Sequence, residues 1–256
     1  MLRQFIRQQG NGLAFHIAKA INGLINTVYP KKCLACKEKL KVPAQNEPIC
    51  ARCLVKIKKN IPPFCSSCGR HLKKTNLTKN ICPHCLETKL HFDRAFSPFA
   101  YEGAIKKLIH EFKYRGKNYL GPYLSAMMVE FIKEYDLPID YIDFIIPIPL
   151  HKTKLREREF NQAQILAELI AKEFGKDTLI GALKRHRYTK TQTDLEIAER
   201  LENVKDSFLV TNPQTVKDKN FLVIDDVLTT GATSSEAAAA LKEAGANIVL
   251  VLTLAN

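Results

Sequence analysis

The sequence has no long apolar run. None of its stretches reaches the uninterrupted hydrophobic length that a signal peptide core or a membrane-spanning helix requires, and Lys19 interrupts the best candidate near the N-terminus. We therefore expect no membrane span and a cytoplasmic protein. Hydrophobic residues still make up 46% of the 256 residues, which is enough for one ordinary domain and a smaller one.

Acidic residues are scarce in the N-terminal third of the chain. Residues 1–92 contain 17 Lys and Arg but only 3 Asp and Glu, whereas residues 93–256 contain 22 and 23, so the local balances are +14 and −1. A basic block of this kind attracts polyanions, most often nucleic acid and less often an anionic membrane surface. A lysine-rich surface that is merely solvated would have the same composition.

The cysteines form a repeat in this basic region. The spacing C-x2-C-x13-C-x2-C occurs twice with an offset of 32 residues, and the two copies comprise Cys33, Cys36, Cys50, Cys53, Cys65, Cys68, Cys82 and Cys85. Two pairs of thiolates complete the four-sulfur tetrahedron that structural zinc adopts. We predict two structural zinc ions, with the pairs combined either within each copy or in an interleaved order.

Other uses of eight cysteines fit this pattern less well. Disulfides are disfavoured in a reducing cytosol, and a redox C-x-x-C pair would not need four copies. A catalytic zinc requires an open coordination position, which four cysteines do not leave. We expect His71 and His84 not to be ligands. Residues 31–92 are therefore predicted to form a small, basic double zinc-ribbon module.

Residues 1–30 are expected to form a helix ahead of this module. Apolar residues recur near helical spacing from Leu13 to Val28, and Pro30 ends the pattern. Such a helix would pack on the ribbon or on a partner. A helix at a membrane surface is the alternative, although its polar face has few charges.

From residue 93 the pattern changes to strands that alternate with helices. Strand-like runs occur at 94–101, 143–148, 178–185, 220–225 and 247–255, and helical patterns at about 103–114, 119–135, 155–174, 194–204 and 234–244. This alternation predicts an α/β domain over residues 93–256, in which helices cover both faces of a mostly parallel sheet. Ligands of such domains bind beyond the carboxyl ends of the strands.

The stretch VIDDVLTTGAT, residues 223–233, lies at such a strand end. Asp225 and Asp226 end the apolar run, and Gly231 allows the backbone to approach an anion at the start of the next helix. The stretch is not a P-loop, because no Gly-Lys-Thr or Gly-Lys-Ser follows, and it lacks the G-x-G-x-x-G dinucleotide fingerprint. An ordinary strand-to-helix turn would explain the glycine and a cap, but not both aspartates.

The acidic pair restricts the ligand of this loop. Two carboxylates beside a phosphate would repel it, unless they accept hydrogen bonds from neighbouring sugar hydroxyls. The predicted ligand is therefore a ribose 5-phosphate, and the predicted binding residues are Asp225, Asp226, Thr229, Thr230, Gly231, Ala232 and Thr233.

A second candidate group follows the strand at 143–148. Basic side chains at the entry to a helix suit a pyrophosphate bound to Mg²⁺, and the candidates are Lys152, Lys154, Arg156 and Arg158. A surface helix that begins with Arg–Glu pairs would have the same sequence.

The acidic pair with TTGAT resembles the phosphoribosyl pyrophosphate signature of type I phosphoribosyltransferases. Together with the cysteine pairs, KYRG, PIPLHKTKLREREFNQ and YTKTQTDLEIAERLENV, it resembles the ComF family of competence proteins from about residue 30 to the end. The resemblance implies a type I phosphoribosyltransferase-like fold, phosphoribosyl pyrophosphate with Mg²⁺, and a mobile hood at 184–204 that closes the site. The chain departs from the family at Glu159, where glycine is usual.

The resemblance also implies a role in natural transformation, on the cytoplasmic side, where incoming single-stranded DNA is received near a DNA-translocating helicase. We expect a DNA-uptake protein that binds single-stranded DNA and, through its C-terminal domain, phosphoribosyl pyrophosphate or a related phosphoribosyl ligand. An active phosphoribosyltransferase in nucleotide metabolism or salvage is the alternative, and an adaptor with a degenerate site is a third. The acceptor nucleophile, catalytic residues and oligomeric state are not identifiable from the sequence.

Overall fold

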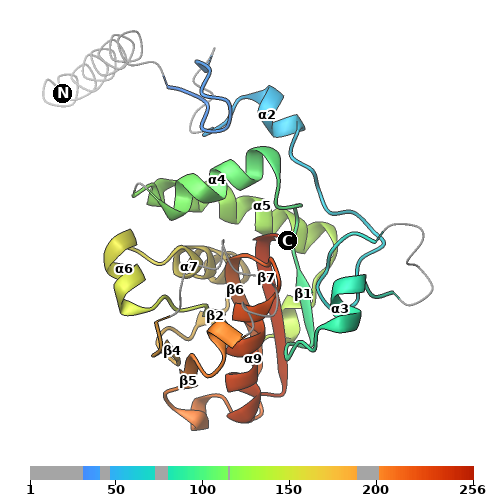
Figure 1. Cartoon of the computed structure of the whole chain (residues 1–256), viewed down its shortest axis with the longest axis vertical. Helices are drawn as coiled ribbons and strands as arrows, with labels where there is room; N and C mark the ends of the chain where they lie inside the picture. Colours follow the sequence, from blue (N-terminus) through green and yellow to red (C-terminus); the bar gives the residue numbers. More distant parts are fainter. Residues whose placement is uncertain (1–30, 41–46, 73–79, 115, 189–201) are drawn as a thin grey trace, which may run out of the picture. The chain divides into compact units, whose positions relative to one another are not determined.

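The computed structural model describes residues 31–40, 47–72, 80–114, 116–188 and 202–256 (Figure 1). The chain divides into two compact units, Met1–Val55 and Lys56–Asn256. The expected helix at 1–30 lies outside the described residues, as does most of the one expected at 194–204. Among the described residues, no helix combines the length and apolar character that crossing a lipid bilayer requires.

The second unit is built on a five-stranded sheet in which every pair of neighbours is parallel. The order of its strands across the sheet is β1 (Arg94–Phe96), β7 (Ile248–Ala255), β6 (Asn220–Val227), β2 (Phe144–Pro147) and β3 (Asp177–Thr178). The central strands β6 and β7 are almost wholly buried. Their continuous apolar sequences follow from this burial on both faces.

Helices cover both faces of this sheet (Figure 1). On one face, α5 (Gly121–Glu134) packs against α7 (Gln162–Phe174), and α7 packs on β2 and β6. The step from β6 to β7 runs opposite to the step from β2 to β3, so a right-handed crossover puts α9 (Ala232–Glu243) on the other face. The predicted α/β class, with a mostly parallel and doubly covered sheet, is confirmed.

Further elements surround the sheet. They are α4 (Gly103–Lys113), α6 (Lys152–Arg158), the 3-10 turns η2 (Asn118–Leu120), η3 (Ile139–Tyr141) and η5 (Pro213–Thr215), and an antiparallel pair formed by β4 (Leu183–Arg185) and β5 (Phe208–Val210). Two short helices, α2 (Ala51–Val55) and α3 (Pro83–Glu87), each begin within a cysteine pair.

Two predicted elements are interrupted. The strand predicted at 178–185 is two strands in different sheets, because Gly181 turns the chain between them with φ +84°. The helix predicted at 155–174 is two helices, because Glu159 ends α6 in the left-handed conformation with φ 68°. Glycine adopts this conformation without steric cost, which explains why the resembling family usually has glycine there.

The second cysteine copy belongs to the core of the second unit. Its Cys65, Cys68 and Cys82 are buried in one hydrophobic cluster with Phe92, with Val249 and Val251 of β7, and with Ala237, Ala238 and Leu241 of α9. This copy therefore helps to cover the sheet face on which α9 lies. In the first unit, Cys33, Ala35 and Ile49 are buried.

Candidate functional site

A cleft of about 530 Å³ lies where β2 and β6 end. Its lining includes both carboxylates of the acidic pair, two threonines of the following loop, and four cationic side chains. These charged and hydroxyl residues are Asp225, Asp226, Thr229, Thr233, Lys113, Lys154, Arg158 and Arg185. The carboxyl ends of the strands thus bring members of both predicted groups to one cavity, as expected for an open parallel sheet; Thr230, Gly231 and Ala232 do not line it.

The acidic pair lies near the end of β6, which extends to Val227 rather than ending at 225. Asp226 is buried and its Oδ1 lies 2.7 Å from Nζ of Lys113, at the C-terminal end of α4. Asp225 Oδ1 accepts the amide hydrogen of Asp226 at 2.8 Å. Desolvation and the Asp226 charge raise the pKa of Asp225 to about 7, although Lys113 and Arg185 act in the opposite direction.

The loop after β6 turns directly into α9. Gly231 stands at the helix N-cap with φ 79°, a left-handed conformation that residues with a side chain rarely adopt. Thr230 is buried, and its Oγ1 accepts the amide hydrogen of Ala232 at 3.4 Å. The positive end of the α9 dipole therefore lies beside the cleft, which is favourable for an anion.

The four basic residues predicted on α6 divide between two faces of the helix. Lys154 and Arg158, four residues apart, line the cleft, whereas Lys152 and Arg156 are exposed and do not line it. Burial, and then the charges of Arg185 and Arg158, lower the pKa of Lys154 to about 8. The structure thus brings half of the predicted group to the cavity.

Two residues of the FNQ stretch, 160–162, connect the elements that carry the basic side of the cleft. Asn161 caps α7 by accepting the amide hydrogen of Ala163 at 3.1 Å, and it donates to the carbonyl of Ile148 at 3.0 Å. Gln162 is buried and donates to the carbonyl of Lys113 at 3.2 Å. These bonds join the ends of α4, β2 and α7, so they position Lys113 opposite Asp226.

The sequence interpretation did not single out every residue of the cleft. Lys113 and Tyr114 lie in KYRG, and Arg185 lies at the start of the predicted hood, but Tyr101 and His110 had no such signal. The cation of Arg158 lies 5.2 Å from the ring centre of Tyr114. Residues 189–201 of the predicted hood lie outside the described residues.

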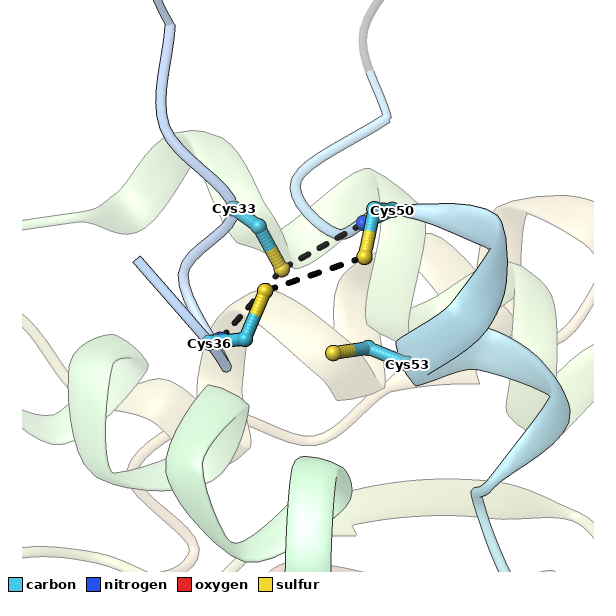
Figure 2. Close-up of side chains that lie close together, drawn as sticks. All are labelled: Cys33, Cys36, Cys50 and Cys53. Carbon is cyan, nitrogen blue, oxygen red and sulfur yellow. Dashed lines mark hydrogen bonds between the residues drawn. The ribbon is translucent and has the colours of Figure 1, made fainter. Parts of the chain in front are cut away.

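Both cysteine copies gather four sulfurs, and the pairs combine within each copy rather than interleaved. Figure 2 shows the side chains of the first copy, whose sulfurs point toward one another. Two neighbouring sulfurs are 3.8 Å apart in the first copy and 3.7 Å apart in the second. A zinc tetrahedron with Zn–S bonds of about 2.3 Å has edges of about 3.8 Å, so both copies fit zinc.

Backbone amides support the sulfurs as thiolates. The amides of Cys36 and Cys50 donate to Sγ of Cys33, and the amide of Cys82 donates to Sγ of Cys65. Burial raises the pKa of Cys33, but these amide bonds outweigh it and lower the value to about 6. Burial and the crowding of sulfurs raise the pKa of other members of each tetrad, so a bound cation is what would keep all four ionised.

The two histidines bind carbonyl groups rather than the sulfur clusters. His71 Nδ1 lies 2.8 Å from the carbonyl oxygen of Ile61, and His84 Nε2 lies 2.9 Å from that of Thr230. Neither belongs to a tetrad. His84 instead contacts the loop that begins α9.

Two family models match this chain. One, described as a double zinc ribbon domain, matches residues 24–86, and the other, described as a phosphoribosyl transferase domain, matches residues 161–256. A solved structure of glutamine phosphoribosylpyrophosphate amidotransferase from Bacillus subtilis is 20% identical, with a TM-score of 0.38. That match covers 56% of this chain and 30% of the solved chain, and it supports no inference about function.

Relatives of known name match most of the chain. Competence protein F of Haemophilus influenzae is 26% identical over 88% of this chain and 96% of its own. Competence protein ComFC of Bacillus subtilis is 28% identical over 78% and 80%, and DNA utilization protein YhgH of Escherichia coli K12 is 27% identical over 75% and 83%. With its paired cysteine tetrads and its phosphoribosyltransferase domain, the chain is a homologue of the proteins named competence protein F, ComFC and YhgH.

Proposed function

We propose that this protein handles single-stranded DNA in the cytoplasm during DNA uptake, and that its cleft binds phosphoribosyl pyrophosphate or a related phosphoribosyl ligand. One observation carries the second part of the proposal. The acidic pair, the loop at the N-terminus of α9 and the cations of α4, α6 and β4 line a single cavity at the carboxyl ends of the strands.

Each part of the ligand has a matching group in this cavity. The 5-phosphate would bind the loop Thr229–Thr233 at the positive end of α9. The ribose hydroxyls would donate to Asp225 and Asp226, and the pyrophosphate would lie near Lys154, Arg158 and Arg185. Mg²⁺, when bound with the ligand, would neutralise part of the pyrophosphate charge.

The raised pKa of Asp225 gives this proposal a specific pH dependence. Folding raises the pKa of this carboxyl from 3.8 to about 7. The neutral carboxyl therefore contributes its full stabilisation of the fold below pH 3.8, and this contribution is lost as pH rises through 7. Hydroxyl donors of a bound ribose favour the ionised form instead. Affinity for ribose 5-phosphate is therefore expected to increase as pH rises from about 6 to about 8.

Asp225→Asn tests both consequences with one variant. Above about pH 7 it should stabilise the ligand-free protein, because it removes a poorly solvated charge. It should also weaken binding of phosphoribosyl pyrophosphate with Mg²⁺ by about 1.5–3 kcal/mol, because a charged acceptor is removed. Thermal unfolding at about pH 5 and about pH 8 and calorimetric titration measure the two effects.

Asp218→Asn is a suitable control, because Asp218 is exposed and its left-handed backbone, with φ 59°, is one that asparagine tolerates. It should change neither quantity. If Asp225→Asn and Asp226→Asn both bind the ligand as wild type does, VIDDVLTTGAT is only a strand and a helix start.

Pyrophosphate release in the same titration, with purines, pyrimidines or amines added, would favour the alternative of an active phosphoribosyltransferase. Binding without release would favour a regulatory ligand.

The DNA part of the proposal rests on the basic residues of 31–92. The four lysines around the first cysteine pair are exposed; they are Lys31, Lys32, Lys37 and Lys39. In contrast, Lys58 is ion-paired with Glu102, and Lys59 lies within 4.0 Å of two glutamates of α5. The lysines around the first pair are thus the better placed of these two groups for binding phosphates.

Substitution of Lys31, Lys32, Lys37 and Lys39 by glutamine tests the DNA site. Affinity for a single-stranded oligonucleotide should fall, and the slope of log affinity against log salt should become shallower by about 0.7 for each phosphate that is no longer neutralised. Glutamine at Lys106, Lys107, Lys172 and Lys217 removes the same charge from exposed positions beyond residue 92 and is the control. Equal reductions in affinity in both variants would reduce the effect to net charge and contradict a site in 31–92.

A further inference from the structure

The second cysteine copy holds the backbone of the candidate phosphate loop. A guanidinium nitrogen of Arg70 donates to the carbonyl of Thr229 at 2.9 Å, and Nε2 of His84 lies 2.9 Å from the carbonyl oxygen of Thr230. A carbonyl only accepts, so this histidine nitrogen carries the hydrogen. Two successive peptide groups of the loop are therefore fixed by side chains from residues 65–85, at sequence separations of 159 and 146.

The segment after the second copy packs under the same loop. A Cβ at Gly231 would lie 3.3 Å from Leu90 and 3.7 Å from Phe92, so the glycine rests directly on these two side chains. In the first turn of α9, Oγ of Ser235 accepts the amide hydrogen of His91 at 3.0 Å and lies 3.1 Å from its ring Nδ1. The loop is thus held from Thr229 to Ser235 on one side.

The planarity of the peptide bond determines where the amide groups of this loop point. In a trans peptide the carbonyl of one residue and the amide of the next point in opposite directions. Because the carbonyls of Thr229 and Thr230 point to Arg70 and His84, the amides of Thr230 and Gly231 point away from the ribbon. No acceptor among the described residues takes either amide hydrogen. Two neighbouring donors beside a helix N-terminus are the arrangement that binds a phosphate group.

We propose that His84 and Arg70 are positioning residues for the phosphate loop, so that the second cysteine tetrad sets the affinity for the phosphoribosyl ligand. This inference rests on the proposed function of the cleft. His84 lies between the tetrad members Cys82 and Cys85, at the start of α3, so the metal that orders this pair also orders the imidazole. Removal of metal from the second tetrad would therefore free the phosphate loop from its His84 contact, although no residue that lines the cleft is substituted.

The test compares three histidine variants of the full-length, zinc-loaded protein. His84→Phe keeps a ring and removes the donor, whereas His84→Gln restores an amide donor near the place of Nε2. His71→Phe is the matched control, since His71 makes the same kind of bond to the carbonyl of Ile61. Three quantities are measured: zinc per chain, hydrogen–deuterium exchange of Thr230 and Gly231 without ligand, and the Kd of phosphoribosyl pyrophosphate with Mg²⁺.

We expect His84→Phe to retain both zinc ions, to exchange these two amides faster, and to bind the ligand roughly three- to tenfold more weakly, as the removal of one hydrogen bond implies. His84→Gln should be close to wild type, and a merely structural role of the ring would not give this rescue. Arg70→Met should act in the same direction, independently of the cysteine pair that carries His84.

Wild-type exchange and wild-type affinity in both His84→Phe and Arg70→Met would overturn the proposal. Faster exchange with unchanged affinity would overturn the link between the tetrad and ligand binding. If the wild-type protein itself binds no phosphoribosyl ligand, the proposed function of the cleft fails, while the exchange rates still decide whether His84 holds the loop.

Discussion

The two cysteine copies have the same local structure. In each copy the amide that begins the first pair bonds to a carbonyl five residues on, Cys33 to Glu38 and Cys65 to Arg70, at 2.8 Å in both. The amide of Cys50 donates to Sγ of Cys33 at 3.4 Å, and the amide of Cys82 to Sγ of Cys65 at 3.3 Å. The offset of 32 residues is therefore a true structural repeat, whose geometry follows from the spacing alone.

Their surroundings differ. The residue after the first pair is Lys37, with φ 64°, and the residue after the second pair is Gly69, with φ 69°. A Cβ at Gly69 would lie 2.4 Å from the carbonyl oxygen of Ala95 in β1, a distance too short for any side chain. The same turn tolerates lysine in the first copy and requires glycine in the second, because the turn of the second copy is packed against β1.

This difference assigns different roles to the two copies. The position before the last cysteine is Arg52 in the first copy, where it pairs with Glu38, and His84 in the second, where it contacts the loop. The first copy has exposed lysines, for which we propose contact with a polyanion. The second is a structural part of the phosphoribosyltransferase-like unit.

The largest expected difference concerns the cysteines. Cys65→Ser should remove one zinc and abolish the cooperative unfolding of the second unit, a destabilisation of about 5 kcal/mol or more, because the tetrad is part of its core. Cys33→Ser should also remove one zinc but leave the main thermal transition in place. Metal analysis and differential scanning calorimetry measure both. Disappearance of the main transition in both variants would show that the two copies are equivalent after all.

The next difference concerns the residue after each first pair. Gly69→Ala should destabilise the protein by about 3 kcal/mol, because it combines a left-handed backbone with a contact that displaces β1. Lys37→Gly should have the opposite sign and stabilise the first unit by about 1 kcal/mol, since it relieves the same backbone cost. Urea unfolding gives both values. A tolerated Gly69→Ala would mean that the second copy does not pack as described.

The smallest difference concerns polar contacts. Buried Asn60 donates to the carbonyl of Ser97 and to Asn256 Oδ1, both at 2.9 Å, and Asn256 in turn donates to the carbonyl of Cys68. Asn60→Ala should cost about 2 kcal/mol, because it leaves buried acceptors unpaired. Arg52→Ala removes an exposed ion pair and should cost less than about 1 kcal/mol. Urea unfolding measures both losses of stability. A larger loss for Arg52→Ala than for Asn60→Ala would contradict the difference between the two copies.

Local patterns predicted much of this protein. Cysteine spacing fixes a tetrad because its ligands are close in sequence, and the buried strands of a parallel sheet are continuous apolar runs; both the fold class and the family resemblance are confirmed. The breaks at Glu159 and Gly181 were missed, because helical or strand-like residues continue on both sides of each.

The long-range contacts had no sequence signal. Arg70 and Thr229 are separated by 159 residues, and only the packed core brings them within hydrogen-bond distance. Arg185 likewise reaches the cleft only because a second small sheet carries it there. The assignment of cleft residues to parts of the ligand remains a prediction.

The most direct test of this account is an amide NMR titration of the full-length protein with ribose 5-phosphate. We expect saturable shifts at Thr230, Gly231 and Ala232 and smaller ones in the second cysteine copy at His84, with none at Cys33 or Cys50. Absence of shifts at the loop, or equal shifts in the two cysteine copies, would contradict it.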